Sequence, residues 1–172
     1  MKLLAELSDK TFGLKPAKVS KWTIRRAART VILNDKNEVI MVHSQKFDYY
    51  KIPGGGVEDQ ESITDAVKRE ALEETGYKIK VIKPVGMIIE YRSKIKLAQI
   101  SYCFLSHTIG KQKRPQFTDS ENSEQFSPVK IKSINQAMRL MKKGKKLPYL
   151  AKFMVRRDSA FLQNAIPRPM FI

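Results

Sequence analysis

The chain has 172 residues and a formal net charge of +16 at pH 7, and 42% of its residues are hydrophobic. This length suits one ordinary domain that buries a core, and this composition excludes a disordered chain. No apolar run approaches the roughly 20 residues of a membrane span, and charge interrupts residues 1–6 too soon for a signal peptide. Cys103 is the single cysteine, so no intrachain disulfide can form, and we expect a cytoplasmic protein with Cys103 as a buried core thiol.

The charge is unevenly distributed along the chain. Residues 61–77 hold five acidic and two basic residues, whereas residues 78–116 hold nine basic residues and one acidic residue. Residues 129–172 hold eleven basic residues and one acidic residue. Basic residues around an acidic centre are expected to attract polyphosphates or nucleic acid. The plainer alternative is a lysine-rich surface that serves only solubility.

The elements expected before residue 54 are mainly strands. Three leucines within an N-terminal extension, residues 1–20, allow either an edge strand or a short helix. Residues 23–33 predict a strand, and residues 38–43 predict a second strand after a polar turn. We therefore expect these two strands to form a hairpin.

An aromatic segment, residues 47–53, leads into a run of three glycines. Tyr49 and Lys51 in this segment are our candidates for substrate contact. A tyrosine here, Tyr49 or Tyr50, is suited to stacking on a nucleobase. Packing in the core is the commoner use of a tyrosine, and that alternative stays open.

A helix is expected from residue 62 to residue 75. Ser62 is a suitable N-cap, and Gly76 stands where a helix favours a left-handed residue after its last turn. Apolar residues recur every four positions and give the helix one stripe that can pack on a core: Ile63, Val67 and Ala71.

Three glutamates lie beside that stripe. Glu70, Glu73 and Glu74 stand at positions i, i+3 and i+4, so their side chains converge on one face of the helix. Three carboxylates repel one another there unless a hard divalent cation such as Mg2+ neutralises them. The glycines at 54–56 let the backbone approach a ligand closely because they lack a Cβ. A solvated acidic face is the alternative, and the glycine turn together with Arg69 favours the metal site.

These residues together resemble the box motif of the Nudix hydrolase family. Tyr77 is aromatic where an aliphatic residue is more usual, and it can still pack. The preceding Ile-Pro-Gly-Gly segment, residues 52–55, also resembles the family. Every fixed position of the box is filled: Gly55, Glu61, Arg69, Glu70, Ala71, Glu73, Glu74, Gly76 and Tyr77.

The resemblance implies an α+β protein with the Nudix fold, a three-layer α/β/α sandwich built on a mixed β-sheet. It implies that Glu70, Glu73 and Glu74, with the carbonyl oxygen of Gly54, hold Mg2+ or Mn2+. It also implies a structural role for Glu61 and Arg69, which are expected to pair and to hold the loop against the helix.

Downstream of the box, residues 78–90 and 98–107 predict two strands, the second apolar enough to be central in the sheet. Between them residues 91–96 predict a basic loop, in which Arg92 is a further candidate for substrate contact. Residues 110–127 predict a polar loop that carries two glutamates. Many Nudix enzymes supply an additional acid from such a loop, and Glu124 is the first candidate here, with Glu121 second.

The C-terminal part predicts a short strand near residues 129–131, a helix over 133–143 that Gly144 ends, and a last helix over 148–164. Residues 130–157 hold ten basic residues and no acidic one. A solvated outer face is favoured over contact with RNA or a membrane surface. Without repeats or a clear linker, we expect residues 1–172 to form a single Nudix domain with residues 133–165 as C-terminal helices, either a monomer or a homodimer.

The expected reaction is hydrolysis of a diphosphate linkage in a nucleoside diphosphate linked to another moiety. The metal polarises the linkage, and a carboxylate of the box or of the later loop takes the proton from the attacking water. A nucleoside triphosphate is the default substrate, because family members that cleave ADP-ribose carry a proline where this chain has residues 91–93. The alternative is an RNA 5′-end pyrophosphohydrolase or an RNA-binding protein that uses the basic C-terminal helices. A catalytically silent ligand sensor is a third hypothesis, and the complete set of carboxylates disfavours it.

Overall fold

The structure is a computed structural model that describes residues 1–142 and 147–165. In these residues eight strands form one sheet in the order β1-β6-β7-β2-β3-β4, with β5 paired to β2 and β8 paired to β3. The strands are β1 (Leu3–Ser8), β2 (Thr23–Leu33), β3 (Val39–Ser44), β4 (Tyr49–Lys51), β5 (Gly54–Gly56), β6 (Lys78–Arg92), β7 (Leu97–Ile109) and β8 (Phe126–Ile131). The α-helices are α1 (Ile63–Thr75), α2 (Asp119–Ser123), α3 (Ile134–Met141) and α4 (Tyr149–Ala165), with short 3-10 helices at Asp9–Phe12 and Ser93–Ile95.

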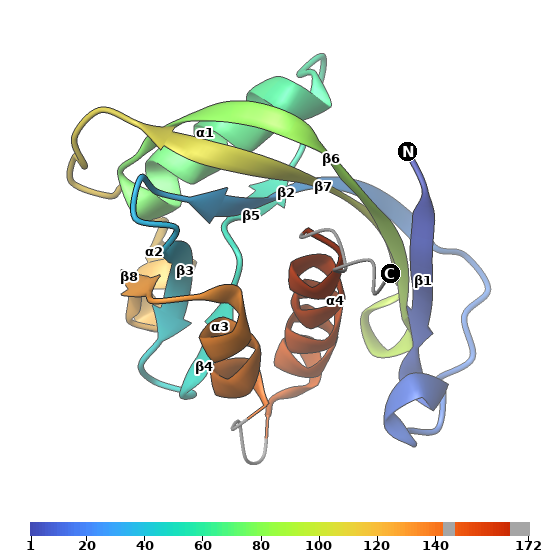
Figure 1. Cartoon of the computed structure of the whole chain (residues 1–172). Helices are drawn as coiled ribbons and strands as arrows, with labels where there is room; N and C mark the ends of the chain where they lie inside the picture. Colours follow the sequence, from blue (N-terminus) through green and yellow to red (C-terminus); the bar gives the residue numbers. More distant parts are fainter. Residues whose placement is uncertain (143–146, 166–172) are drawn as a thin grey trace, which may run out of the picture.

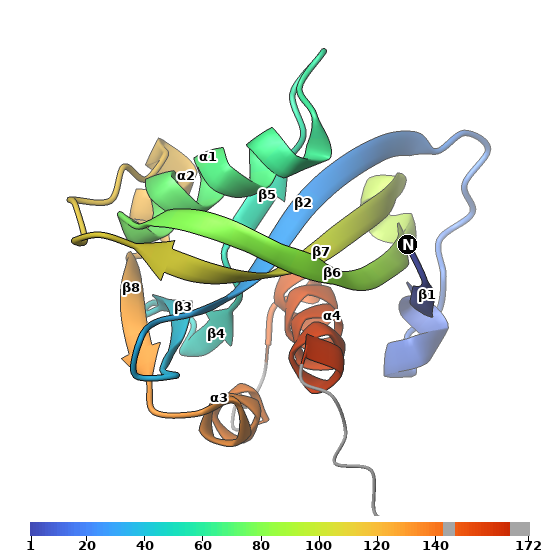
Figure 2. The same ribbon diagram turned by 45° about the horizontal axis from the view of Figure 1, so that its top comes forward.

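The elements are arranged in three layers. Helix α1 covers one face of the sheet, and α3 and α4 lie on the other face (Figures 1 and 2). The strand pairs β1–β6 and β2–β7 are parallel, and the other pairs are antiparallel. This mixed sheet between helices confirms the predicted α+β sandwich with the Nudix fold.

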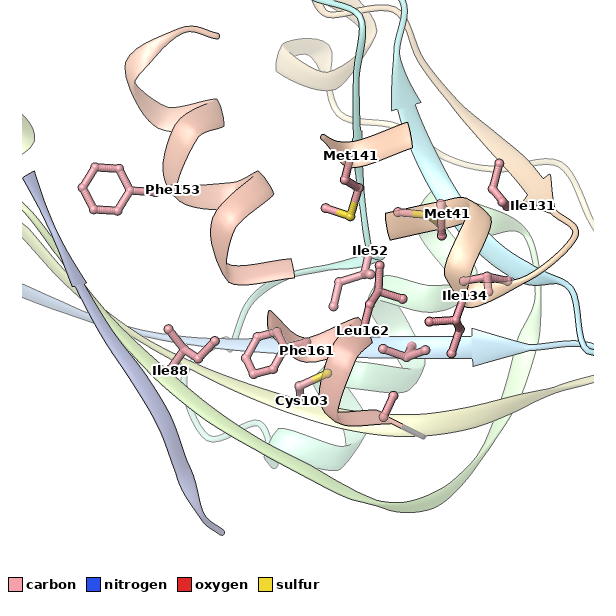
Figure 3. Packing of buried hydrophobic residues seen from close by; sticks show 14 of the residues in the cluster. Met41, Ile52, Ile88, Cys103, Ile131, Ile134, Met141, Phe153, Phe161 and Leu162 are labelled. Atoms are coloured by element: carbon pink, nitrogen blue, oxygen red, sulfur yellow. The ribbon is translucent and has the colours of Figure 1, made fainter. Parts of the chain in front are cut away.

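Two parts of the hydrophobic core lie on opposite sides of the sheet. The larger part lies under α3 and α4, where Phe153, Phe161 and Leu162 of α4 pack toward the strands (Figure 3). Cys103 of β7 belongs to this part and is fully buried, which confirms it as a core thiol. The smaller part lies under α1 and contains Val67, as the apolar stripe predicted.

The central strands run side by side over a long distance, and this register places side chains that are distant in sequence. Strands β2 and β7 are paired from Thr23 with Leu97 to Leu33 with His107. Gln99 lies opposite Arg25 on one side and opposite Glu90 on the other. Because side chains alternate between the two faces of a strand, these three residues lie on the face that α4 covers.

Several predicted elements are present. Leu3, Leu4 and Leu7 all lie on β1, an edge strand, which confirms the strand alternative for the N-terminal leucines, and a 3-10 helix without leucine follows. Strands β2 and β3 form the predicted hairpin, although only two residue pairs join them. The last predicted helix, residues 148–164, corresponds to α4. The predicted end of the preceding helix at Gly144 lies outside the described residues, and α3 ends at Met141.

Three predicted boundaries are wrong. The three glycines form strand β5, since they pair with β2 instead of turning freely. The basic loop at 91–96 is shorter than expected, because Arg92 is the last residue of β6 and is buried. Residues 110–127 are not one loop, because Thr118 caps a helical turn, α2, and β8 begins at Phe126 and pairs with β3.

The long terminal helix is not merely a solvated outer layer. Arg157, one of the ten basic residues of this region, is fully buried together with Asp158. Their ion pair compensates the charge, which is what permits burial at this position. Among the described helices none is both long and apolar enough to cross a membrane.

Candidate active site

The sequence caps helix α1 at both ends and thereby fixes which face it presents. The Ser62 side chain accepts a hydrogen bond of 3.1 Å from the amide of Asp65. Gly76 ends the helix in the left-handed region at φ 73°, and its amide donates to the carbonyl of Leu72. Because one face of the helix is packed on the sheet, the acidic side chains are left to face the glycines of β5.

Two of these glycines are required by close packing. A Cβ on Gly54, whose φ is 139°, would lie 2.1 Å from the carbonyl oxygen of Ala28. A Cβ on Gly55 would lie 2.3 Å from Oε1 of Glu70. No larger residue fits at either place, and the backbone of β5 therefore lies directly against the carboxylate of Glu70.

Glu74 is held from two sides. Its Oε2 accepts a hydrogen bond of 2.9 Å from the amide of Gly54, and Oε1 accepts one from Nζ of Lys51. Only 2% of the side chain is exposed. Burial raises the pKa of Glu74 to about 7, and the charge of Lys51 opposes that rise. Glu74 thus joins α1, β4 and the start of β5.

Arg69 is bonded to most of the remaining groups of the predicted site. Its guanidinium donates to both oxygens of Glu61, at 2.9 and 3.0 Å, so the expected pair is present. It also donates to Glu70 at 2.9 Å, to Glu73 at 3.1 Å and to the carbonyl of Gly56 at 2.9 Å. One cation therefore compensates three carboxylates and fastens the glycine strand to α1.

In residues 1–142 and 147–165, no group of three or more acidic, histidine or cysteine side chains is gathered in a geometry that could hold a metal ion. Arg69 and Lys51 instead occupy carboxylate oxygens of Glu70, Glu73 and Glu74. The donor set nevertheless has the chemistry of a Mg2+ site, since all ligands are oxygens. Burial raises the pKa of Glu70, with the hydrogen bond from Arg69 acting against it, so a further cation beside this carboxylate would be stabilising.

The two later glutamates also reach this region. Glu124 Oε2 accepts a hydrogen bond of 2.9 Å from the hydroxyl of Tyr49, and burial is the main reason that the pKa of Tyr49 is raised. Glu121 caps α2 by accepting hydrogen bonds from the amide and hydroxyl of Thr118. Burial by itself would raise the pKa of Glu121, but hydrogen bonds from Thr118, the proximity of Glu74 and the charge of Lys51 outweigh it, so the pKa is lowered and Glu121 lies beside Glu74.

These groups line one pocket of about 840 Å³. Pockets of this size are usual for small ligands. We call its two charged sides the acidic wall and the basic wall. The acidic wall consists of Glu58, Glu70, Glu73, Glu74, Glu121 and Glu124, and the basic wall consists of Arg25, Arg29, Arg92 and Gln99.

A buried polar network supports the basic wall. Glu90 of β6 accepts hydrogen bonds from Arg92 at 2.8 Å, from Gln99 at 2.9 Å and from Arg157 at 3.3 Å. Burial by itself would raise the pKa of Glu90, but the charges of Arg157 and Arg92 outweigh it and lower the pKa to about 2. Glu90 is therefore ionised, and its carboxylate fixes the positions of the Arg92, Gln99 and Arg157 side chains.

The same network reaches the glycines. Arg157 Nε donates to Oδ1 of Asp158 at 2.6 Å, and Oδ2 of Asp158 accepts a hydrogen bond of 3.0 Å from the amide of Ile52. Ile52 precedes the Pro53–Gly54 segment that carries the amide bonded to Glu74. Helix α4 is thus linked to the beginning of the glycine strand.

Comparison with known proteins identifies the family. The sequence profile of the NUDIX domain matches residues 23–153, which include the acidic wall and the beginning of α4. The chain belongs to the Nudix family. It is therefore a Nudix hydrolase, an enzyme that acts on acid anhydrides in phosphorus-containing compounds.

Individual Nudix relatives are distant in sequence. A putative 8-oxo-dGTP diphosphatase of Bacillus subtilis (strain 168) is 26% identical over 106 residues, which cover 62% of this chain and 68% of the relative. A NUDIX hydrolase from Nitrosomonas europaea superimposes with a TM-score of 0.59 at 17% identity, over 87% of this chain and 97% of the other. A MutT protein from Methanosarcina mazei Go1 gives 0.51 at 20% identity, over 82% and 96%. At these identities the structural similarities show the fold alone.

The structure brings together all the residues that the sequence singled out for this Nudix site. Gly54, Tyr49, Lys51 and Arg92 line the same pocket as the box glutamates. Sequence reasoning missed Arg29, Gln99 and the Arg157–Asp158 pair. Arg29, Gln99 and Asp158 each place a charged or amide side chain within an otherwise apolar strand or helix face. That pattern in the sequence could have indicated buried polar residues at these positions.

Proposed function

We propose that this Nudix hydrolase cleaves a diphosphate linkage in a nucleotide with the help of a divalent metal ion, and that a nucleoside triphosphate is its substrate. The observation that carries the proposal is one pocket with an acidic wall facing a basic wall. The acidic wall suits a cation and the basic wall suits the negative charge of phosphate oxygens. A polyphosphate between the two walls satisfies both.

Gly54, through its carbonyl oxygen, and the side chains of Glu70, Glu73 and Glu74 would hold Mg2+ or Mn2+. When bound, the ion polarises the linkage, spreads the charge that develops on it and lowers the pKa of bound water. Arg69 and Glu61 keep the helix against the glycine strand, so that the carboxylates stay close to the scissile linkage.

The proton of the attacking water goes to a carboxylate of the acidic wall. Glu124 is our candidate for this base, because its oxygen is fixed by Tyr49 and its side chain lines the pocket. Glu121 is the second candidate, and its place beside Glu74 also suits a contribution to the metal site. Lys51 binds and orients the phosphates, and the positive charge of the basic wall attracts the nucleotide to the pocket.

The choice of a nucleoside triphosphate has independent support. The Bacillus subtilis relative is described as a putative diphosphatase of 8-oxo-dGTP, which is a modified nucleoside triphosphate. We expect the same class of substrate here. The RNA alternative depends on exposed basic residues within or directly after β8, α3 and α4: Lys130, Lys132, Arg139, Lys142 and Arg156.

The decisive experiment measures phosphate or pyrophosphate release from nucleoside triphosphates, ADP-ribose, dinucleoside polyphosphates and 5′-triphosphate RNA, with Mg2+ or Mn2+. We expect turnover of nucleoside triphosphates that falls by at least about 100-fold in Glu73→Gln, because a charge that faces the metal is lost. Glu6→Gln, the same substitution on the exposed edge strand β1, should keep wild-type activity. Turnover of 5′-triphosphate RNA and of no other compound would show that RNA, and not a nucleoside triphosphate, is the substrate. No turnover of any compound by the metal-bound protein would contradict the proposed reaction.

A further inference from the structure

The geometry points to a subsite on the basic wall that reads a nucleobase through an N–H group flanked by two carbonyl oxygens. We call it the imide subsite; it consists of Gln99, Arg92 and the β2 arginines Arg25 and Arg29. Uracil, thymine and the oxidised edge of 8-oxoguanine carry such a group. The inference rests on the proposed function, because it assigns the base of the same nucleotide.

The first observation is a set of buried polar atoms without a partner. In the described part of the chain, Nε of Arg29, Nε of Arg92 and Oε1 of Gln99 have no hydrogen-bond partner. Gln99 is fully buried, and Arg29 and Arg92 are 6% and 5% exposed. All three residues line the pocket. Leaving such groups unpaired is costly, so a ligand that pairs them gains affinity.

The second observation is that the amide of Gln99 has a fixed orientation. Its Nε2 donates to Glu90 at 2.9 Å and to Ser101 at 3.0 Å. A carboxylate only accepts hydrogen bonds, so the nitrogen must face Glu90 and the oxygen must face away from it. Ser101 donates to the same carboxylate and can only accept from Gln99. Gln99 therefore presents an acceptor alone.

The strand order places this acceptor between donors. Gln99 lies on β7, Arg92 lies on the neighbouring strand β6, and the two arginines lie on β2 at its other side. Arg92 and Arg25 are close enough for the charge of Arg25 to lower the pKa of Arg92, to which burial contributes most. Arginine has donors only. The wall therefore presents donor, acceptor and donor in that order across the sheet.

This pattern selects the ligand chemistry. A phosphate group has no donor near neutral pH, so a site for phosphate alone would not place the oxygen of Gln99 among its arginines. The complementary edge is acceptor, donor, acceptor, which is O2, N3–H, O4 in uracil and thymine. In 8-oxoguanine the same order is O6, N7–H, O8.

Other bases fail at the central position. Cytosine presents an acceptor, N3, where uracil has N3–H, and unmodified guanine presents the acceptor N7 where 8-oxoguanine has N7–H. Two acceptors would then face each other in a buried site. The imide subsite therefore distinguishes 8-oxo-dGTP from dGTP and dUTP from dCTP by the same hydrogen bond.

The test compares kcat/KM within matched pairs: dUTP with dCTP, and 8-oxo-dGTP with dGTP. One good hydrogen-bonded base contact changes discrimination by about 10- to 100-fold, and we expect wild type to prefer the imide member of each pair by about this factor. Gln99→Met, which keeps the length of the side chain but removes the acceptor together with the amide donor to Glu90 and Ser101, should abolish the preference. Gln163→Met, on the exposed face of α4, is the matched control and should keep both preferences.

Three outcomes would overturn the inference. Wild type without a preference within either pair does so before any variant is made. An equal loss on all four nucleotides in a Gln99→Met protein with a wild-type melting temperature would show a structural role for Gln99. If Gln99→Met changes the preference between UTP and dUTP instead, the oxygen of Gln99 contacts a ribose hydroxyl and not the base.

A binding experiment separates this inference from the proposed function. Calorimetry with dUMP and dCMP, which have no diphosphate linkage, should show tighter binding of dUMP to wild type and none of that difference in Gln99→Met. If this holds while no nucleotide is hydrolysed, the subsite stands and the proposed reaction is wrong. If nucleotides are hydrolysed without an imide preference in turnover or binding, the reaction stands and the subsite is wrong.

Discussion

The two walls of the pocket are built in different ways. The box part of the acidic wall comes from one continuous segment, in which the glycines of β5 and the glutamates of α1 are separated by a single loop. The basic wall comes from β2, β6 and β7 and is held by α4, elements that are far apart in the chain. The positions of charged side chains in one site can thus be determined by residue spacing within a single segment on one wall and by the register of the strands on the other.

The walls also differ in how their charges are compensated. The carboxylates of α1 are bonded to Arg69 and Lys51, at positions that a metal ion can take over. Arg92 and Gln99 of the basic wall are bonded to Glu90, which is fully buried and cannot exchange partners with solvent. We therefore expect changes in the acidic wall to alter activity and changes in the support of the basic wall to alter stability.

The largest effect is expected from Arg157→Met, which removes the cation between Glu90 and Asp158. Two buried carboxylates then lose the cation they share, Asp158 its only ion-pair partner in the described residues, and breaking a buried ion pair in this way costs about 3–5 kcal/mol. Urea denaturation should show this loss in the free energy of unfolding. Arg156→Met, at the exposed neighbouring position, should change it by less than about 0.5 kcal/mol. Similar losses in both variants would contradict a supporting role for Arg157.

The pH dependence of stability should report Glu90. Its pKa is about 2 in the folded protein, below its usual value of 4.5, so its ion pairs stabilise the fold fully above pH 4.5. That contribution, about 3 kcal/mol, is lost as the pH falls from 4.5 toward 2. Unfolding free energies measured from pH 6 down to pH 3 should fall less steeply in Glu90→Gln than in wild type. An unchanged slope would mean that Glu90 does not carry this charge.

Gly55→Ala should separate activity from stability on the acidic wall. The new Cβ would lie 2.3 Å from the carboxylate of Glu70, and the end of that side chain must move aside. A displaced catalytic group of this kind lowers kcat/KM by about 100-fold, while the fold should stay intact. The comparison is Gly56→Ala, whose Cβ meets the end of the Arg25 side chain at 2.8 Å and not Glu70, so it should raise KM through Arg25 and leave kcat close to wild type. Equal kinetic effects in the two variants would argue against close packing at Gly55.

The smallest effect is expected from Tyr49→Phe. It removes the hydroxyl that donates to Glu124 and leaves the ring packed against Phe126. Loss of one such hydrogen bond should lower kcat/KM by about fivefold. Tyr50→Phe, on a ring that stacks on His43 instead, should leave kcat/KM unchanged. If Tyr49→Phe has no effect while Glu121→Gln inactivates the enzyme, Glu121 replaces Glu124 as the candidate base.

How much of the molecule was predictable follows from the range of the interactions. Helix α1, its caps and the contact of Arg69 with Glu61 depend on residues within one segment, and the sequence predicts them. The strands β4 and β5 were missed because their pairing partners, β3 and β2, decide their conformation. Short segments with little periodicity of their own are extended only when a neighbouring strand is present.

The basic wall was not predictable for a related reason. Gln99 reads as an ordinary polar residue at the start of an apolar run, and nothing nearby in sequence shows that Glu90 lies beside it. Arg157 was counted with a solvated face, because the count of basic residues contains no information about a buried partner. Only the register of β6 with β7 and the packing of α4 bring these residues together.

The hydrogen bond between the amide of Ile52 and Asp158 makes the box motif dependent on the far end of the chain. A graft of residues 54–77 onto another sheet would transfer the carboxylates and glycines without the anchor that sets where the glycine strand begins. Shortening the protein before α4 would likewise leave the acidic segment intact in composition but free to shift along β2. The catalytic motif and the terminal helix are therefore one mechanical unit, and they have to be exchanged together in any chimera.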